Sequence, residues 1–270
     1  MPVEIRSFRI FPGSSIELSQ SEPLQGDEVR KVNDDEFTFA VSIGIRASKN
    51  SVSTSHYCAG VLISPRHVLT AGHCILTDEE MKTVEIRAGS RDLQSPNLKI
   101  FKPQSWLTYK AWAKNKKYPP NKLPNDIAII TLTVEQTKIE PVSLSIKSVI
   151  ADGTIVTVAG WGLFNEKKLP SKMRKVQLKV ISKRECCNKI TSLKPDFNYN
   201  INHESFVCYF ANPYALAACG DSGDPIIDEQ KTLVAIHTAR CPKIGDIHPQ
   251  QVNIGVSIGY YRYFIDDVVK

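Results

Sequence analysis

The sequence predicts an all-β protein built from many short strands. Short β-branched runs recur along the chain, turn signals separate them, and only the C-terminal tail has helical periodicity. Many short strands with almost no helix are typical of β-sandwiches and β-barrels. With 270 residues the chain is long enough for one large β domain or for two smaller lobes.

The first 30 residues are predicted to be an exposed leader or pro-segment. They contain the turn-forming run Pro12-Gly-Ser-Ser15 and a polar stretch at 19–23. Residues 1–6 lack the basic-then-apolar layout of a secretory signal, so either a signal was removed before this numbering or export was never intended. Regular structure is expected to begin near Phe37, within a domain at 31–270.

The strand candidates lie on both sides of Glu140-Pro-Val142, the most natural break in the chain. This break divides the domain into a first lobe at 31–141, a second lobe at 142–258 and a C-terminal helix at 259–270. In that helix Tyr261, Phe264, Ile265 and Val268 form one apolar face. The strand candidates are 39–43, 60–63, 67–70, 84–87, 126–132, 154–158, 176–181, 205–208, 225–227, 233–236 and 252–256.

Composition excludes several classes of function. The chain is 42% hydrophobic and 23% charged, and no apolar run approaches the ~18 residues that a membrane span needs, so we expect no membrane insertion. The net charge of +6 gathers at 110–122 and 167–184, which could steer an acidic partner. A solvated face is favoured, because neither segment has the basic helix or interleaved aromatic residues of a nucleic-acid binder.

The seven cysteines favour disulfides and an oxidising, extracellular setting. No C-x-x-C pair or neighbouring histidine pattern predicts a metal site, and no cofactor is expected. An odd count leaves one thiol over. The adjacent Cys186 and Cys187 cannot easily bond to each other, so one of them is free or forms an intermolecular disulfide. We otherwise expect a monomer.

Three residues form a candidate catalytic triad. Ser222 lies in Gly220-Asp-Ser-Gly-Asp-Pro225, where glycines allow a tight turn that leaves backbone N–H groups free for an oxyanion. His73 is the candidate base and Asp126, at the start of an apolar strand, the carboxylate that orients it. Each residue alone is more often a turn, core or strand-start residue, but the order His, Asp, Ser excludes two other hydrolase folds.

Four motifs in this order resemble the chymotrypsin/trypsin-like serine protease family. They are Thr70-Ala-Gly-His-Cys74, Asn125-Asp-Ile-Ala-Ile-Ile130, Ala159-Gly-Trp-Gly162 and Cys219-Gly-Asp-Ser-Gly223. The resemblance covers roughly Phe37 to the C-terminus. It implies two packed six-stranded antiparallel β-barrels, a zymogen, and hydrolysis of protein or peptide substrates through an acyl-enzyme, with serine protease inhibitors as further partners.

The resemblance also assigns roles to individual residues. It implies an oxyanion hole made by the N–H groups of Gly220 and Ser222, and an activation role for Asp221. It further implies disulfides that pair Cys58 with Cys74, Cys186 with Cys208, and Cys219 with Cys241, which leaves Cys187 as the odd thiol, with an exchange between Cys186 and Cys187 still open.

The sequence departs from the family around the serine and the specificity pocket. Cys219 abuts Gly220 with no residue between them, and Asp224 replaces a glycine. The base of the pocket falls at Leu216 or Ala217 and its opposite wall at Gln250 or Gln251. Neither candidate for the base is acidic, so cleavage after Lys or Arg is not expected, and a small or apolar side chain is favoured.

The activation segment also departs, because the chain contains no Ile-Val-Gly-Gly tetrapeptide. Leu24-Gln-Gly-Asp27 matches only by position, and a terminus after Arg30-Lys31 is too short to reach Asp221. The leading hypothesis is therefore a serine endopeptidase of uncertain activity level. The rival is a non-catalytic, protease-like binding or regulatory protein with a blocked cleft, and a third is a polyanion-binding module that uses 167–184.

Overall fold

The computed structural model describes residues 29–46, 54–119, 121, 123–162, 171–197, 201–211, 215–217, 220–244 and 248–270. Most of the predicted leader and Cys219, with its predicted link to Cys241, lie outside the described residues. So does part of the basic segment at 167–184. Among the helices in the described residues, none is both long and apolar enough to cross a membrane.

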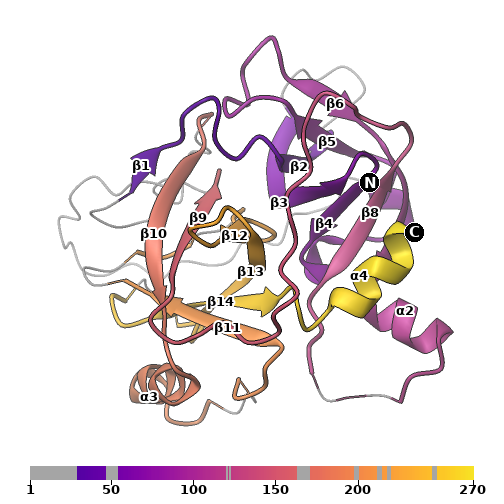
Figure 1. Cartoon of the computed structure of the whole chain (residues 1–270). Coiled ribbons are helices and arrows are strands. Elements are labelled where there is room, and N and C mark those ends of the chain that lie inside the picture. The colour runs from indigo at the N-terminus through magenta and orange to yellow at the C-terminus, as the bar shows by residue number, and fades with distance from the viewer. Residues whose placement is uncertain are drawn as a thin grey trace, which may run out of the picture.

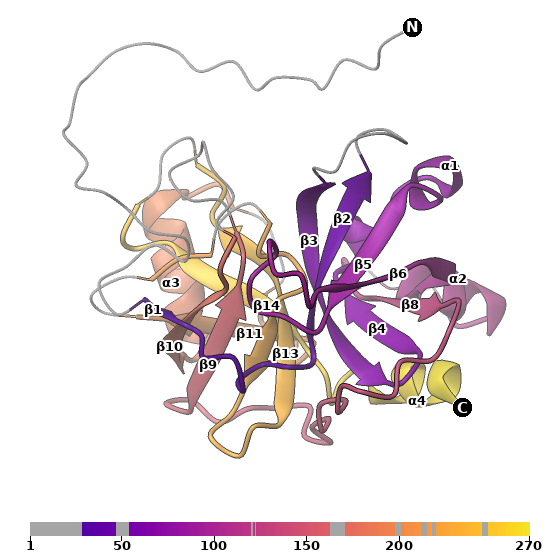
Figure 2. The same cartoon turned by 90° about the horizontal axis from the view of Figure 1, so that it is seen from above.

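The C-terminal half of the chain folds into a closed six-stranded barrel (Figures 1 and 2). Its antiparallel strands follow the order β10, β11, β14, β13, β12, β9, and pairing between β9 and β10 closes the ring. A short N-terminal strand, β1 (Arg30–Lys31), adds to β10 from outside. The six barrel strands are β9 (Ile155–Gly160), β10 (Arg174–Val180), β11 (Phe206–Phe210), β12 (Pro225–Ile227), β13 (Leu233–Cys241) and β14 (Val252–Ser257).

The N-terminal half forms a second antiparallel sheet beside this barrel. Its seven strands follow the order β6, β5, β2, β3, β4, β8, β7, and the sheet curls without β6 pairing to β7. The first lobe is thus a curled seven-stranded sheet, whereas the sequence predicted a six-stranded barrel. The strands are β2 (Ala40–Arg46), β3 (Thr54–Ser64), β4 (His67–Thr70), β5 (Val84–Ala88), β6 (Lys99–Phe101), β7 (Pro103–Thr108) and β8 (Ala128–Leu132).

One hydrophobic core joins the two lobes. It includes Leu69 and Ile129 from the first sheet together with Trp161 and Ile236 from the barrel, all almost fully buried. Burial of apolar side chains across both lobes stabilises their packing by about 25 cal/mol per Å² removed from water. The segments that end at the junction are therefore held in fixed relative positions.

The predicted C-terminal helix is confirmed as α4 (Arg262–Val269), with Phe264 and Ile265 buried. It packs on α2 (Tyr109–Asn115) of the first lobe, where the Trp112 indole donates to Asp267 at 2.8 Å. Helix α4 follows the second lobe in the sequence but lies against the first lobe (Figure 1).

The all-β class and the eleven predicted strands agree with the structure, but the sequence analysis missed three helices. These are α1 (Asp78–Met81), α2 and α3 (Lys183–Leu193). Each begins after a Ser or Thr whose side chain accepts a backbone N–H, the usual helix N-cap. Helix α3 is mostly polar, and only Cys186 and Ile190 are buried, so its apolar stripe was too narrow to recognise.

Candidate active site

His73 is held where β4 ends at the junction of the lobes. Residues Gly72–Cys74 form a single 3₁₀ turn, and a disulfide between Cys74 and Cys58 ties this turn to β3. A Cβ atom on Gly72 would lie 3.0 Å from the Ile127 nitrogen and 3.1 Å from an Asp126 carboxylate oxygen. Glycine at this position therefore lets the histidine turn approach the segment that carries Asp126.

Both carboxylate oxygens of Asp126 form hydrogen bonds with His73. Oδ2 lies 2.8 Å from His73 Nδ1, and Oδ1 accepts the His73 backbone N–H at 2.8 Å. Because a carboxylate oxygen only accepts, Nδ1 carries the hydrogen and Nε2 of the neutral ring is left as a proton acceptor. The His73 side chain is 47% exposed, so the histidine lies at the surface of the junction.

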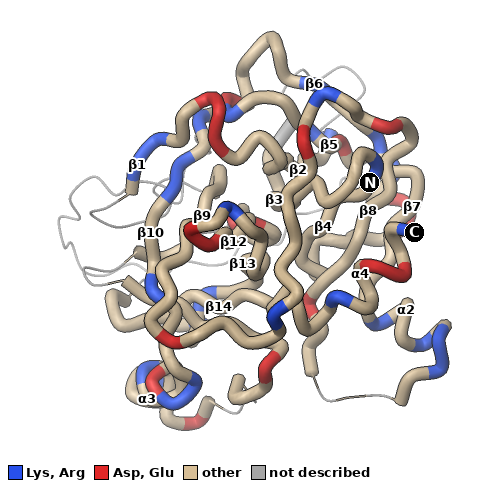
Figure 3. Tube along the Cα trace, in the orientation of Figure 1, with Lys and Arg blue, Asp and Glu red and all other residues tan. Residues whose placement is uncertain are grey.

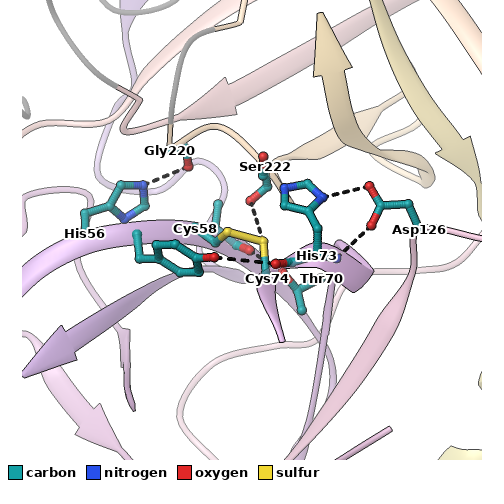
Figure 4. Close-up of a disulfide and its surroundings, with 10 residues drawn as sticks. His56, Cys58, Thr70, His73, Cys74, Asp126, Gly220 and Ser222 are labelled. Carbon is teal, nitrogen blue, oxygen red and sulfur yellow. Dashed lines mark hydrogen bonds and ion pairs between the residues drawn. A yellow bond between two sulfur atoms is a disulfide. The ribbon is translucent and has the colours of Figure 1, made fainter. Parts of the chain in front are cut away.

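Ser222 completes the group from the barrel side. It lies in the turn before β12, and Figure 4 shows the His73 imidazole between Ser222 and Asp126. The Ser222 carbonyl oxygen accepts the Ala59 N–H of β3 at 2.7 Å, and the Cys74 sulfur lies 3.8 Å from the same oxygen. The structure therefore brings together the three residues that the motifs predicted, from three separated segments.

Gly220 occupies a conformation that favours glycine, with φ of +100°. Its carbonyl oxygen accepts a hydrogen bond from Nε2 of the buried His56 at 3.0 Å, and His56 Nδ1 lies 2.8 Å from Ser42 Oγ. Burial lowers the pKa of His56 to about 4, so the ring is neutral and bridges β2, β3 and the serine loop. Sequence reasoning missed His56, because a lone histidine near a cysteine carries no motif.

Two carboxyl groups lie behind Ser222, from Asp221 and Asp224. Both residues have zero exposure. Asp221 Oδ1 accepts the Gly162 N–H at 2.7 Å, whereas neither carboxylate oxygen of Asp224 accepts a hydrogen bond from a described residue. Burial, followed by the neighbouring Asp221 charge, raises the pKa of Asp224 well above its ordinary value.

A second buried pair, Tyr209 and His237, lies on the barrel side of the triad. The Tyr209 hydroxyl bonds to His237 Nδ1, and the His237 backbone carbonyl accepts the Gly223 N–H at 2.8 Å. Burial lowers the pKa of His237 to about 3. His237 lies in β13, so a neutral imidazole lies next to the serine loop, which its backbone carbonyl holds at Gly223.

The residues predicted to form the specificity pocket occupy different environments. Leu216 and Ala217 are buried, and the Ala217 N–H donates to the Asn253 side chain at 2.8 Å. Gln251 is fully buried and its amide holds its own loop, donating to the Pro242 carbonyl and accepting the His248 N–H. Gln250 is exposed and contacts Lys189 of α3, so its assignment to the pocket stays a prediction.

The remaining cysteines are distributed as follows. Cys186 of α3 is bonded to Cys208 of β11, the pairing that the resemblance implied. Cys187 is a half-exposed free thiol, and Cys241 has no disulfide partner among the described residues. Cys58, Cys74 and His73 place sulfur and nitrogen atoms within 4.8 Å of one another, but disulfide sulfurs are not thiolate ligands, so this group does not suit a metal.

A serine, a histidine and an aspartate come together at the junction of a closed barrel and a curled sheet. This arrangement defines the class of two-lobed serine hydrolases. The family model described as Trypsin matches residues 27–265. The chain belongs to the chymotrypsin/trypsin-like serine protease family.

Three curated relatives illustrate this similarity. Human granzyme M is 34% identical over 183 residues, 64% of this chain and 64% of the relative. Chymotrypsin-2 of Vespa crabro is 28% identical over 193 residues, 70% of this chain and 78% of the relative. Trypsin iota of Drosophila melanogaster is 28% identical over 179 residues, 65% of this chain and 66% of the relative. The matched part of the chain thus spans less than two thirds of granzyme M and of trypsin iota.

Proposed function

We propose that this chain is a serine endopeptidase in which Ser222 is the nucleophile, His73 the general base and Asp126 the residue that orients it. The observation that carries the proposal is the double hydrogen bond between Asp126 and His73, with Ser222 on the other side of the imidazole. This arrangement fixes the ring tautomer that a general base needs.

The reaction follows from these positions. Ser222 Oγ attacks the scissile carbonyl carbon while its proton passes to His73 Nε2, and the carbonyl oxygen becomes an oxyanion. His73 then gives this proton to the leaving amine as the C–N bond breaks, which leaves an acyl-enzyme. Water repeats the same two steps and releases the acid.

Oxyanion stabilisation is proposed for the N–H groups of Gly220 and Ser222. The Gly220 carbonyl is bound to His56, which fixes the peptide that precedes Asp221. A backbone N–H aimed at an oxyanion in a dry site contributes about 3 kcal/mol to transition-state stabilisation.

The proposed substrates are proteins or peptides with a small or apolar residue before the cleaved bond. Buried Leu216 and Ala217 supply no carboxylate for a Lys or Arg side chain. Two disulfides, Cys58–Cys74 and Cys186–Cys208, support a secreted protein.

A peptide library that varies the residue before the cleaved bond tests this function. Cleavage after small or apolar residues by the purified, processed protein, and none by S222A, is the expected result. Efficient cleavage after Lys or Arg would contradict the specificity. The same lack of cleavage for both proteins would favour the non-catalytic alternative.

Acidic residues lie beside the Lys and Arg residues of the surface. Polyanion binding is therefore a weaker proposal than peptide-bond hydrolysis. Figure 3 shows that the blue segments lie apart on α2, β10 and α3, with red residues beside them. Lys116 pairs with Asp267 at 2.8 Å and Lys189 lies 3.9 Å from Glu185. Continuous attraction of a polyanion needs basic residues without such compensation.

A further inference from the structure

Helix α2 and the turn after it carry three exposed lysines that form no ion pair with a described residue. Lys110 and Lys114 lie one turn apart on the same face of α2, and Lys117 follows the helix with φ of +60°. The segment 109–125 contains no Asp or Glu. Like charges at this spacing slightly destabilise a helix, so helix formation does not account for these lysines. We call the three residues the lysine ridge.

Acidic residues of α4 bound the ridge on one side. Lys116 pairs with Asp267 at 2.8 Å, and Asp267 also accepts the Trp112 indole N–H at 2.8 Å. Asp266 pairs with Arg262 within α4. Figure 3 shows the lysines of α2 and of the turn after it, with red residues of α4 beside them. The uncompensated positive charge is therefore short and covers about two helical turns.

Two exposed tyrosines lie at the C-terminal end of α2. Tyr118 follows Lys117, is 45% exposed, and stacks on Trp112 with ring centroids 5.3 Å apart. Tyr263 of α4 is 60% exposed and meets the same indole edge-on at 5.7 Å. Trp112 itself is buried and fixes both rings. Tyrosines held on a rigid support are common anchors in protein interfaces, because each offers an apolar face and a polar hydroxyl.

The ridge begins next to the segment that carries Asp126. The backbone N–H of Tyr109, the residue before Lys110, donates to the carbonyl oxygen of Ile127 at 3.0 Å. From there α2 extends for about 10 Å at 1.5 Å per residue, a length that about three extended residues of a bound peptide would cover. The ridge therefore lies within reach of a polypeptide that occupies the active site.

A short acidic polypeptide fits this surface better than a long polyanion. A polyanion gains its affinity from many phosphate or sulfate contacts along a continuous basic track, and the acids of α4 interrupt such a track. A peptide with two or three carboxylates needs only the three lysines, and the tyrosines add apolar contact. Complementary charge also accelerates the encounter of the two partners.

We propose that the lysine ridge and Tyr118 form a docking surface, outside the active site, for an acidic segment of the protein substrate. The proposal rests on the proposed protease function for the identity of the occupant as a substrate, but not for the binding itself. Docking of this kind stabilises the bound substrate and the transition state equally. It therefore lowers KM and leaves kcat unchanged.

The first test measures binding without catalysis, by fluorescence anisotropy. It uses S222A and a fluorescein-labelled peptide of alternating Glu and Tyr residues. Adding K110Q/K114Q/K117Q to S222A should weaken binding about tenfold or more, and adding Y118A should weaken it about threefold. Binding should also weaken as sodium chloride rises from about 50 to about 300 mM, because salt screens exposed charges.

A matched control removes three exposed lysines elsewhere on the molecule, K138Q/K179Q/K231Q. Lys231 has almost the same backbone φ as Lys117, +61°. This control should bind the peptide as S222A does, and the peptide with Gln in place of Glu should bind neither protein. Equal weakening in the ridge variant and in the control would show an effect of net charge alone and would overturn the proposal.

Other occupants of the same surface are tested in parallel, with a heparin oligosaccharide and with oligothymidylate. Both should bind more weakly than the acidic peptide. Tighter binding of either one, lost in K110Q/K114Q/K117Q, would show that the ridge serves a polyanion and would overturn the acidic polypeptide as its occupant.

The second test compares cleavage of a peptide substrate with and without the Glu-Tyr segment attached at either end. The segment should lower KM about tenfold for the parent protein, with kcat unchanged, and K110Q/K114Q/K117Q should lose this gain. An unchanged KM for the parent would overturn the role in substrate docking.

Failure of the docking surface and failure of the proposed function are distinguishable. Tight peptide binding at the ridge of a protein whose Ser222 never reacts with a fluorophosphonate would contradict the protease function and keep the surface. Efficient cleavage without peptide binding at the ridge would keep the protease function and overturn the surface.

Discussion

At Gly223 the backbone has φ of +90°, and a Cβ atom would lie 2.0 Å from the Ala59 carbonyl oxygen. The close approach lets the serine loop lie against β3, where the Ala59 N–H holds the Ser222 carbonyl. Gly89 has almost the same φ, +92°, but its nearest contact would be at 3.6 Å. The two positions share the backbone conformation and differ in available space.

Comparison of G223A with G89A separates these two effects. We expect G89A to lower the free energy of unfolding by about 1–2 kcal/mol, the cost of a left-handed residue with a Cβ atom. G223A should lose about 4 kcal/mol or more, because the backbone itself must move, and should also lose Ser222 labelling. Denaturant unfolding measures both losses, and equal losses would show that the contact with Ala59 is unimportant.

Between elements, the two described disulfides differ in what they join. Cys58–Cys74 ties β3 to the turn that carries His73, with a sequence separation of 16. Cys186–Cys208 joins α3 to β11 of the barrel, with a separation of 22. Loops of this length predict a similar stabilisation for each bond, about 3 kcal/mol.

We therefore expect C58A/C74A and C186A/C208A to lower the free energy of unfolding by similar amounts. Only C58A/C74A should also slow catalysis, because only that bond restrains the histidine turn. Cleavage rates measured well below each melting temperature check this. An equal loss of rate in both variants would mean that the Cys58–Cys74 bond contributes to stability alone.

The C-terminal helix adds a contact to the active site that its pattern could not reveal. The Tyr261 hydroxyl donates to the side chain of Asn125 at 3.0 Å, and Asn125, with φ of +47°, precedes Asp126. The apolar face of the helix followed from residue spacing. Its role as a support for the Asp126 loop depends on where the helix packs, which spacing does not encode.

Across the whole molecule, the sequence predicted what is local and missed what depends on packing. Alternation of apolar residues predicted the strands, and four short motifs predicted that His73, Asp126 and Ser222 belong together. The contacts of His56 with Gly220, and of Tyr209 with His237, join residues 164 and 28 positions apart. No spacing rule connects such pairs, so the buried polar groups behind the serine became visible only in the fold.

The central claim, that Ser222 is an activated nucleophile, is tested most directly by labelling the processed protein with a fluorophosphonate and locating the adduct by mass spectrometry. The account predicts one adduct, on Ser222, that is absent in S222A and strongly reduced in H73A. Labelling of H73A at the rate of the parent protein, or no adduct on Ser222, would contradict it.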